Sequence, residues 1–386
     1  FKIKIFFLDK IIFLFFFFII FTGFINDLYF YSEQMEWKGY FSTVKKSIYF
    51  LRYLLLYLIL RILIEKNIIN LKLFFLICSF ATLFVSFDIF FQFIYGKDIF
   101  GFEVISNSRK LSGPFGDELI AGSFIQRFSI FTFFWLPFFY PKKSRAISKY
   151  ILPIILTIFL VAIILSGNRM PMLLFTLTIF LILIFNAQTR KFFFPFVIIF
   201  TILFSIIYNL NSTVRDNFES FYSTVFNMSK ILIEKDFDNK RTPQYLKEFE
   251  TFYNTWLMNK YVGGGIKNFR YYCHHRPDLD KNAKFICNMH PHNYYLEILT
   301  ETGVFGFIII SLVFIIIIYL TLIKKYFLKS FLNNNHIIIP FIFLFIAEIF
   351  PIKSTGSFFT TSNTTYLFLI IGIMIGLVRK SDIIKN

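Results

Sequence analysis

Long apolar runs follow one another along the chain, separated by short polar segments. About ten of these runs are long enough to cross a bilayer as a helix, which takes roughly 20 residues. They lie near residues 5–25, 47–64, 71–94, 119–140, 150–165, 169–186, 192–209, 303–323, 337–351 and 364–379. The pattern predicts an all-α integral membrane protein of about ten transmembrane helices, with one large loop late in the chain.

The same pattern divides the chain into three segments. Residues 1–209 and 303–386 consist mainly of apolar runs, and residues 210–302 form a long polar excursion between them. Four of the five histidines lie in this excursion, together with Pro, Gly and Trp. Loops of such length are usually functional or disordered. The aromatic residues of this one, and a helical stretch near 245–258, predict that it is folded.

Basic residues indicate which side of the membrane each loop faces. After residue 95 every second loop is short and basic, and the positive-inside rule places such loops in the cytoplasm. The residues concerned are Lys142, Lys143, Arg145, Lys149, Arg190, Lys191, Lys324, Lys325, Lys329, Arg379, Lys380 and Lys385. Both ends of the chain are therefore expected in the cytoplasm and residues 210–302 outside it. Lys45, Lys46 and Arg52 depart from the rule, so either the second helix is tilted along the interface or the first two spans are miscounted.

Composition excludes a soluble protein built around one core. Hydrophobic residues make up 56% of the 386, the mean hydropathy is +0.65, and 16% of residues are charged. A single core could not bury so much apolar surface. In a soluble protein, 40 Lys and Arg against 23 Asp and Glu would suggest nucleic acid. Here membrane loops explain much of that charge, and no nucleic-acid partner is expected.

The end of the large loop carries the most informative polar residues. Pro291 disfavours helix just before it, Asn293 is a good N-cap, and Gly303 can end a short helix before the next span begins. This places His292 at the positive end of a helix beside the membrane, where free N–H groups favour an anion such as a diphosphate. An imidazole there could donate to a phosphate or take a proton from an attacking hydroxyl. Alternatively, His292 only caps the helix or sits at the headgroup level.

Two cysteines flank a short polar stretch of the same loop. An oxidising compartment makes a disulfide between Cys273 and Cys287 the default interpretation. A zinc site is the alternative, although the spacing follows no familiar pattern; its ligands would come from Cys273, His274, His275, Cys287, His290 and His292. We expect no metal and no cofactor. The chain has no Walker-type loop, HExxH or GxSxG motif, so ATP use and protease or esterase chemistry have no support.

Three arginines are expected on the outer side, against the trend that keeps positive charge in the cytoplasm. Arg169 follows a tight turn between two apolar runs, and Arg215 and Arg241 lie in the large loop. An arginine fork can hold two phosphate oxygens at once. The three side chains therefore either bind an anionic substrate headgroup or meet lipid headgroups and loop carboxylates.

The string His292-Asn293-x-x-Leu296-x-x-Leu299-x-Glu301-x-Gly303-x-x-Gly306 resembles the signature of the O-antigen ligase and polymerase superfamily. In that family the histidine is considered essential for transfer from an undecaprenyl-diphosphate glycan. Two more segments are similar to family patterns: Arg241 followed by Trp256 and Gly263-Gly264-Gly265, and the turn Leu165-Ser166-Gly167-Asn168-Arg169. The resemblance covers roughly residues 160–310. The chain departs from the family in having fewer spans and a loose spacing from Arg241 to Trp256.

The resemblance implies a glycosyltransferase of the bacterial inner membrane with its active site facing the periplasm. Its donor would be a glycan on undecaprenyl diphosphate, and its acceptor the lipid A core, another lipid-linked repeat, or a protein hydroxyl. The implied catalytic residues are His292, Arg241 and Arg169. His292 would activate the acceptor hydroxyl or steady the leaving diphosphate, and the two arginines would clamp that diphosphate. The implied substrate-binding residues are Arg215, Asn293, Glu301, Gly263 and Gly265.

Two alternatives stay open from the sequence. Glu301 either orients the histidine region or only solvates its helix. A transporter or flippase of an anionic lipid or solute would also suit many helices with outward-lying arginines. Paired Gly/Pro breaks and an inverted repeat, which are typical of such transporters, are not found in the sequence. Of the polar residues within spans, Asp88 and Glu348 are expected near outer span ends.

Overall fold

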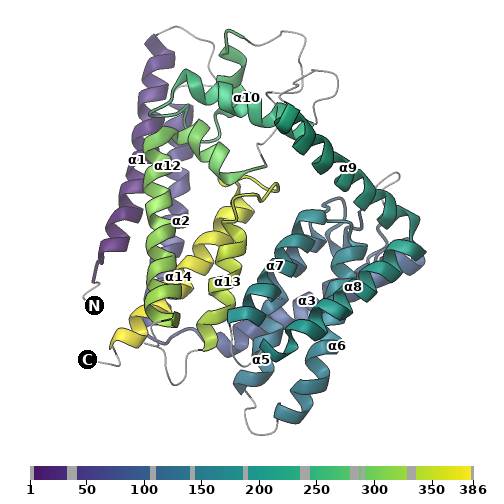
Figure 1. The fold of residues 1–386 in the computed structure, drawn as a ribbon. Helices are drawn as coiled ribbons and strands as arrows, with labels where there is room; N and C mark the ends of the chain where they lie inside the picture. The colour runs from purple at the N-terminus through teal and green to yellow at the C-terminus, as the bar shows by residue number, and fades with distance from the viewer. Residues whose placement is uncertain are drawn as a thin grey trace. The chain divides into compact units, whose positions relative to one another are not determined.

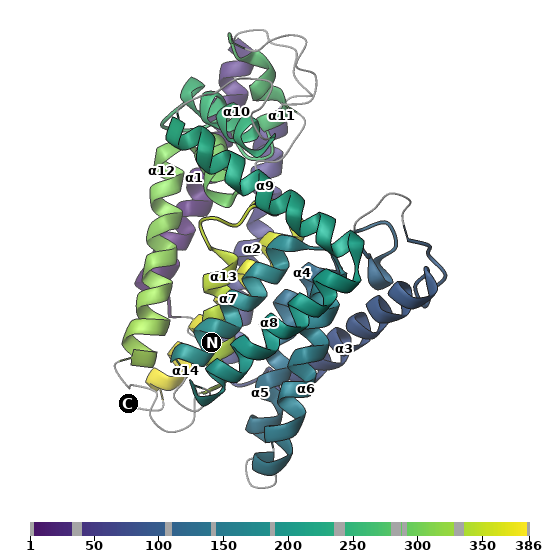
Figure 2. The same ribbon diagram turned by 45° about the vertical axis from the view of Figure 1, so that its right-hand side comes forward.

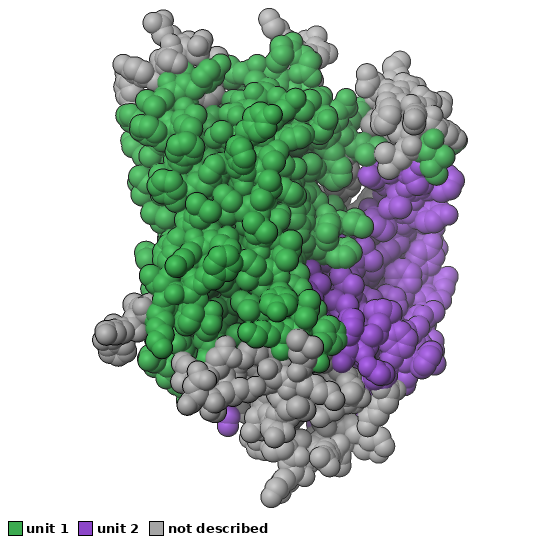
Figure 3. Space-filling model, turned by 60° about the vertical axis from the view of Figure 1, so that its left-hand side comes forward, with its two compact units in different colours: residues 1–68, 230–334, 349–386 green, residues 69–229, 335–348 purple. Residues whose placement is uncertain are grey.

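The computed structural model describes residues 4–32, 41–104, 110–139, 144–185, 190–234, 244–278, 287, 292–327 and 336–383. Its regular structure over these residues is helical, apart from one isolated antiparallel bridge between Lys97 and Glu103 (Figure 1). The all-α class predicted from the apolar runs is therefore confirmed. By its contacts the chain separates into two compact units, each assembled from segments that are far apart in sequence (Figure 3).

Unit 1 comprises residues 1–68, 230–334 and 349–386. Its helices are α1 (Phe7–Ser32), α2 (Ser42–Glu65), α10 (Gln244–Met258), α11 (Phe269–Tyr272), α12 (Tyr294–Ile318) and α14 (Thr361–Ile383). A 3-10 turn follows α11 at Cys273–His275, and a π-helical stretch continues α12 through Tyr319–Phe327. Helix α1 packs against both α2 and α12, and α2 packs along α14; two views show α1 and α12 side by side (Figures 1 and 2).

Unit 2 comprises residues 69–229 and 335–348. Its helices are α3 (Leu71–Tyr95), α4 (Ala121–Phe128), α5 (Ile130–Phe139), α6 (Ser144–Leu165), α7 (Arg169–Phe185), α8 (Phe193–Leu210), most of α9 (Ser212–Glu234), and α13 (Ile339–Glu348). Short 3-10 turns occur at Gly113–Phe115, Arg190–Phe192 and His336–Ile338. Helix α3 packs against α5 and α6, and α7 packs against α13.

Each apolar run is largely helical, but the expected count of ten spans is not confirmed. Six helices among the described residues are long and apolar enough to cross a membrane: α1, α2, α3, α8, α12 and α14. The apolar stretches of α6, α7 and α13 are shorter, and the run at 119–140 is divided into α4 and α5 at Ser129. The chain is thus a multi-pass membrane protein, with six helices that meet the length requirement by themselves.

Helix α2 meets that requirement despite the basic residues near its start. Lys46 donates to the carbonyl of Lys267 at 3.0 Å, and Arg52 donates to the Thr361 hydroxyl at 3.0 Å. Lys267 in a loop and Thr361 at the first position of α14 thus accept hydrogen bonds from these cations within unit 1. This accounts for basic residues at a place where the charge rule does not expect them.

Buried ion pairs join helices inside each unit. In unit 1 the Asp9 carboxylate pairs with Arg61, and it accepts a hydrogen bond from Tyr57 at 2.6 Å; all three side chains are buried. In unit 2 the Arg127 guanidinium meets the buried Glu348 carboxylate at 2.8 Å. A buried charge is tolerated when it is paired and hydrogen-bonded. Glu348, expected from the sequence as a polar residue at a span end, is therefore half of an ion pair between α4 and α13.

Candidate functional site

The predicted helix start after His292 is present. Asn293 is the N-cap of α12, and its side-chain oxygen accepts hydrogen bonds from the N–H groups of Tyr295 at 3.0 Å and Leu296 at 3.2 Å. The expectation of free N–H groups at this helix end is wrong for these two, because the cap occupies both. Positive charge for an anion at this end must come from side chains as well as from the helix dipole.

His292 itself is half-buried and adopts a left-handed backbone conformation, with φ of 47°. Few residues other than glycine adopt this conformation, and histidine is one of those enriched in it. Such conformations persist where the surrounding structure imposes them, and they are frequent at functional sites. The left-handed backbone at His292 directly precedes the Asn293 cap.

The loop between α13 and α14 holds the start of α12 in place. The Asn293 amide donates to the carbonyl of Pro351 at 2.8 Å, and the Tyr295 hydroxyl donates to the carbonyl of Ile349 at 2.5 Å. Glu297, which is buried, accepts hydrogen bonds from the Ser357 hydroxyl and the Phe358 N–H. Three polar side chains at the start of α12, those of Asn293, Tyr295 and Glu297, are thus tied to residues 349–358.

This loop contributes a residue that the sequence interpretation missed. Lys353 is 5% exposed, and its ammonium donates to the Tyr294 hydroxyl at 2.9 Å while lying 4.2 Å from the centre of the Tyr294 ring. The sequence signal that could have identified Lys353 is a single lysine between two apolar runs, in a segment expected on the outer side of the membrane. Its packing against the motif could not be predicted, because 59 positions separate it from Tyr294.

Hydrogen bonds join Glu301 and its neighbour on α12 to the segment that contains the glycine triplet Gly263–Gly265. Glu301 is buried and accepts a hydrogen bond from the Lys267 N–H at 2.8 Å, which excludes the interpretation that it only solvates its helix. The N–H groups of Gly264 and Gly265 donate to the carbonyls of Thr300 and Glu301 at 3.0 and 2.8 Å. The triplet therefore binds the backbone of α12 about two turns beyond the Asn293 cap.

Helix α12 is interrupted at Gly303, where the sequence places the end of a short helix. Gly303 has φ 63° and ψ −171°, and a Cβ there would lie 2.2 Å from the Tyr261 carbonyl oxygen. Only glycine readily adopts this conformation, and only glycine leaves room for the approach of residues 261–263. The helix resumes after the interruption, so α12 is longer than the predicted span at 303–323.

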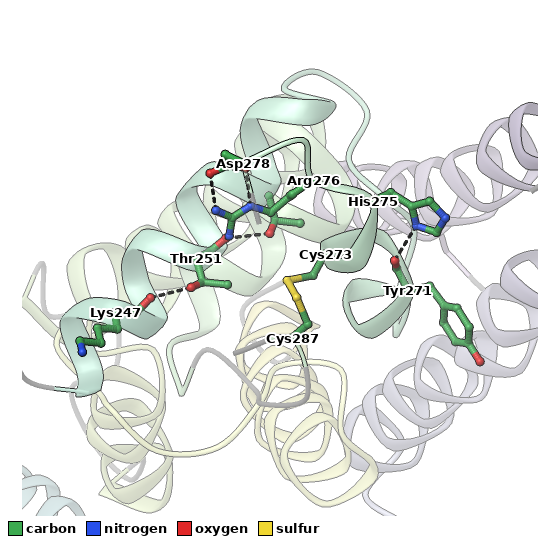
Figure 4. The surroundings of a disulfide bond; sticks show 9 residues. Lys247, Thr251, Tyr271, Cys273, His275, Arg276, Asp278 and Cys287 are labelled. Atoms are coloured by element: carbon green, nitrogen blue, oxygen red, sulfur yellow. Dashed lines mark hydrogen bonds and ion pairs between the residues drawn. A yellow bond between two sulfur atoms is a disulfide. The ribbon is translucent and has the colours of Figure 1, made fainter. Parts of the chain in front are cut away.

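A disulfide bond joins Cys273 and Cys287, and both residues are buried. Figure 4 shows it below Thr251 and Arg276, and Phe252 and Phe269 stack in the same cluster with ring centres 3.7 Å apart. The partly buried Leu296 of α12 packs against this cluster. The disulfide removes both thiolates from the alternative zinc site, and His290 of that set lies outside the described residues.

Charged groups beside the disulfide form a second small network. Arg276 makes two contacts with the Asp278 carboxylate, at 3.0 and 2.5 Å, and also donates to the Thr251 carbonyl at 3.2 Å (Figure 4). The hydrogen bond from Arg276 lowers the pKa of Asp278. Burial raises the pKa of the neighbouring Tyr272 to about 12, so this phenol stays protonated at neutral pH.

Arg169 lies in unit 2, at the first position of α7. Its guanidinium donates twice to the side-chain oxygen of Asn217 on α9, at 3.1 and 2.7 Å, and Asn217 donates to the Gly167 carbonyl at 3.2 Å. Asn168 closes the turn by donating to Ser166, from its backbone N–H to the hydroxyl and from its side-chain amide to the carbonyl and the hydroxyl. Hydrogen bonds within the turn and the one from Asn217 on α9 thus hold the turn that precedes Arg169. Asn217 was not anticipated from the sequence.

A second cation lies within electrostatic reach of Arg169. Desolvation, and to a smaller extent the charge of Arg169, lowers the pKa of Lys110. Two interacting cations form a favourable environment for an anion. Arg215 is exposed on α9, and Arg241 lies outside the described residues. Arg169 is one of the three arginines predicted to bind the substrate. For Arg169 the structure thus defines the hydrogen-bond partner that holds its guanidinium.

Comparison with known proteins adds one finding. Residues 154–311 match a family model described as O-Antigen ligase. The matched range begins in α6, includes the Arg169 turn and the large loop, and ends within α12 beyond Gly306. No curated protein matches the chain.

Proposed function

We propose that this multi-pass membrane protein, in which residues 154–311 match a family model described as O-Antigen ligase, transfers a glycan from undecaprenyl diphosphate to the lipid A core. The transfer takes place on the periplasmic face of the bacterial inner membrane. The observation that carries the proposal is the anchored start of α12. There the residue that follows His292 caps the helix and is held by the loop after α13.

The reaction is a substitution at the first carbon of the glycan. The bond from that carbon to the diphosphate oxygen breaks, and a bond to the acceptor hydroxyl oxygen forms. The hydroxyl proton leaves to a base, and the departing diphosphate carries away the electron pair of the broken bond. The diphosphate leaving group makes transfer favourable without ATP. His292 either takes the hydroxyl proton or donates a hydrogen bond to the departing diphosphate.

Arg169 and Arg241 are assigned to the diphosphate, with Arg215 as a further contact. Guanidinium groups hold phosphate oxygens in pairs and offset the charge that develops as the diphosphate leaves. The bidentate hydrogen bond from Arg169 to Asn217 supports this role, because it holds the guanidinium plane before substrate arrives. Asn293, Glu301, Gly263 and Gly265 are assigned to shaping the His292 end of the substrate site.

The test is lipopolysaccharide synthesis in a ligase-deficient cell that expresses the protein. Wild type and His292→Ala are compared at matched membrane levels, with His275→Ala as the control, since His275 is an exposed histidine of the same unit. We expect wild type and the control to restore glycan-bearing lipopolysaccharide. We expect His292→Ala to lose it by about 100-fold or more, the usual effect of removing an acid–base group.

Each other outcome contradicts a defined part of the proposal. Restoration by His292→Ala at the wild-type level would show that this histidine takes no part in the transfer. Failure of wild type itself, with the protein present in the membrane, would contradict lipid A core as the acceptor. The same cells would then be examined for polymerised lipid-linked repeats and for glycosylated protein.

A further inference from the structure

Two buried carboxylates lie close together at the C-terminal end of α3, in unit 2. Asp88 on α3 and Asp98 in the turn of residues 96–104 are 0% and 1% exposed. The Oδ1 atom of Asp88 accepts from the N–H of Ile99 at 2.7 Å, so Asp88 contacts the residue next to Asp98. The charge of Asp98 also acts on Asp88. An ionisable side chain within a membrane-spanning helix usually marks a function.

Each of these carboxylates keeps one oxygen atom without a donor. The Oδ1 atom of Asp98 accepts from the N–H of Phe102 at 2.7 Å, as that of Asp88 does from Ile99. Among the described residues neither Oδ2 atom has a hydrogen-bond partner, and neither carboxylate forms an ion pair. An N–H that donates to a carboxylate favours its ionised form. A buried charged acceptor without a partner is costly, and a bound ion is one explanation for it.

A second turn covers the Asp88 carboxylate. A Cβ at Gly113 would lie 3.8 Å from the Oδ2 atom of Asp88, so this oxygen faces the Gly113 backbone. Gln92, one helical turn beyond Asp88, holds that backbone in place. Its Oε1 atom accepts from the Gly113 N–H at 2.9 Å, and its amide donates to the Ser112 hydroxyl at 3.2 Å. The unpartnered oxygen therefore lies between α3 and a turn that hydrogen bonds attach to α3.

We propose that Asp88 and Asp98 bind one hard divalent cation, Mg²⁺ or Ca²⁺, at the end of α3. A doubly charged cation balances two carboxylates and gives both Oδ2 atoms a partner. Such cations take carboxylate oxygens and complete their coordination with backbone carbonyls and water. Among the described residues no three His, Cys, Asp or Glu side chains could hold a metal together, so zinc, which takes three or four such ligands, does not fit. The expectation of no metal concerned the large loop, and this site lies outside it.

The cation site adjoins the segment that leads to Arg169. The Leu111 N–H donates to the Ser166 carbonyl, in the turn before Arg169, at 3.3 Å, and the two residues after Leu111 bind α3 through Gln92. Lys110, the cation within electrostatic reach of Arg169, directly precedes this segment. A cation bound beneath it therefore stabilises unit 2 where the Arg169 turn is attached. That consequence for donor binding rests on the proposed function, whereas cation binding itself does not.

A shared proton is the alternative explanation of the pair. In that case one carboxyl stays protonated, and divalent cations leave the stability of the protein unchanged. Cation binding requires instead that the wild type be less stable in EDTA than with Mg²⁺ or Ca²⁺, because the two charges then repel each other. Asp88→Asn separates the two explanations. It keeps an oxygen for the Ile99 N–H and removes one charge, so it should lose the response to cations and retain the fold.

The experiment titrates Mg²⁺ or Ca²⁺ into metal-free protein, purified in dodecyl maltoside without donor, and follows calorimetry and thermal unfolding. The variants are Asp88→Asn, Asp98→Asn and a control, Asp216→Asn, which changes an exposed carboxylate of the same unit. We expect one cation per wild-type chain and a higher melting temperature when it is bound. Asp88→Asn and Asp98→Asn should each bind about 10-fold more weakly or less, the effect of losing a charged contact. The control should behave as wild type does.

Each other outcome overturns the proposal. If neither cation binds the wild type or raises its melting temperature, the pair holds a proton and the site is wrong, while the proposed function stands. Wild-type affinity in both Asp88→Asn and Asp98→Asn would place the cation elsewhere. A stabilisation that NaCl reproduces at equal ionic strength would be charge screening. Should Asp88→Asn not be monodisperse, Asp98→Asn, which changes the turn instead of the helix, is judged by the same criterion.

Discussion

At the scale of single residues, the site depends on side chains that position other side chains. Asn293 makes three hydrogen bonds, two to the first turn of α12 and one to Pro351, and it fixes the chain direction next to His292. Asn217 plays the same part for Arg169. Effective acid–base and anion-binding groups need such positioning, because a displacement of about 1 Å can cost 100-fold in rate.

Replacement of Arg169 tests whether the planar fork is needed or only the charge. Lysine keeps the charge but cannot make the paired contact with Asn217. We expect Arg169→Lys to lower glycan transfer by about 10-fold and Arg169→Ala by about 100-fold or more. The measurement is transfer by purified protein at saturating donor. Arg190→Lys, a change at an exposed arginine, is the control; equal activity of Arg169→Lys and wild type would contradict the role of the fork.

The Arg276–Asp278 ion pair predicts the direction in which the stability of the fold changes with pH. The hydrogen bond from Arg276 lowers the pKa of Asp278 in the folded protein, so the pair stabilises the fold above the unfolded-state pKa of about 4. That contribution is lost as pH falls through the lower folded-state pKa. Asp278→Asn should therefore lower the melting temperature slightly at pH 7 and not at pH 2. A larger difference at pH 2 than at pH 7 would contradict the assignment.

At the scale of helices, much of the fold could be predicted. The apolar runs give the positions of the helices because a membrane imposes a minimum apolar length. The Asn293 cap and the break at Gly303 could be predicted because both depend on local backbone chemistry. The division of 119–140 at Ser129 was not predicted, because the length of the run fits one span, although Gln126 and Arg127 make its first half more polar than its second.

Substitution of Gly303 tests the interlock of α12 with residues 261–265. Gly96 is the matched control, since it also has positive φ (73°) but a Cβ there would meet nothing within 4 Å. We expect Gly96→Ala to cost about 1–2 kcal/mol, the penalty of left-handed backbone. Gly303→Ala should cost about 3 kcal/mol or more, because overlap with Tyr261 is added. Thermal unfolding in detergent measures both, and equal losses would contradict a specific interlock.

Contacts between residues distant in sequence could not be predicted. Asp9 and Arg61 are 52 positions apart, Arg127 and Glu348 are 221 apart, and Lys353 meets Tyr294 across 59. In each case the sequence shows a charge in or near an apolar run and does not show its partner. Such residues mark polar functions or ion pairs, and only the packing of the helices distinguishes the two.

At the scale of the whole molecule, the chain passes repeatedly between two units. Residues 1–68, 230–334 and 349–386 build the unit that carries His292 and Lys353, and residues 69–229 and 335–348 build the unit that carries Arg169. The region matched by the ligase family model, 154–311, contributes to both units. The match to the family model therefore rests on residues of each unit, and loss of activity is predicted from changes in either.

The most direct test is glycan transfer by the purified protein from a defined undecaprenyl-diphosphate glycan to lipid A core. Wild type, His292→Ala and His275→Ala are compared, with joined product and released undecaprenyl diphosphate measured together. The account predicts that the joined product and undecaprenyl diphosphate form in equal amounts, and that His275→Ala forms as much of each as wild type does. It predicts about 100-fold less of each from His292→Ala. Transfer by His292→Ala at the wild-type rate would contradict a role for His292 in the chemistry.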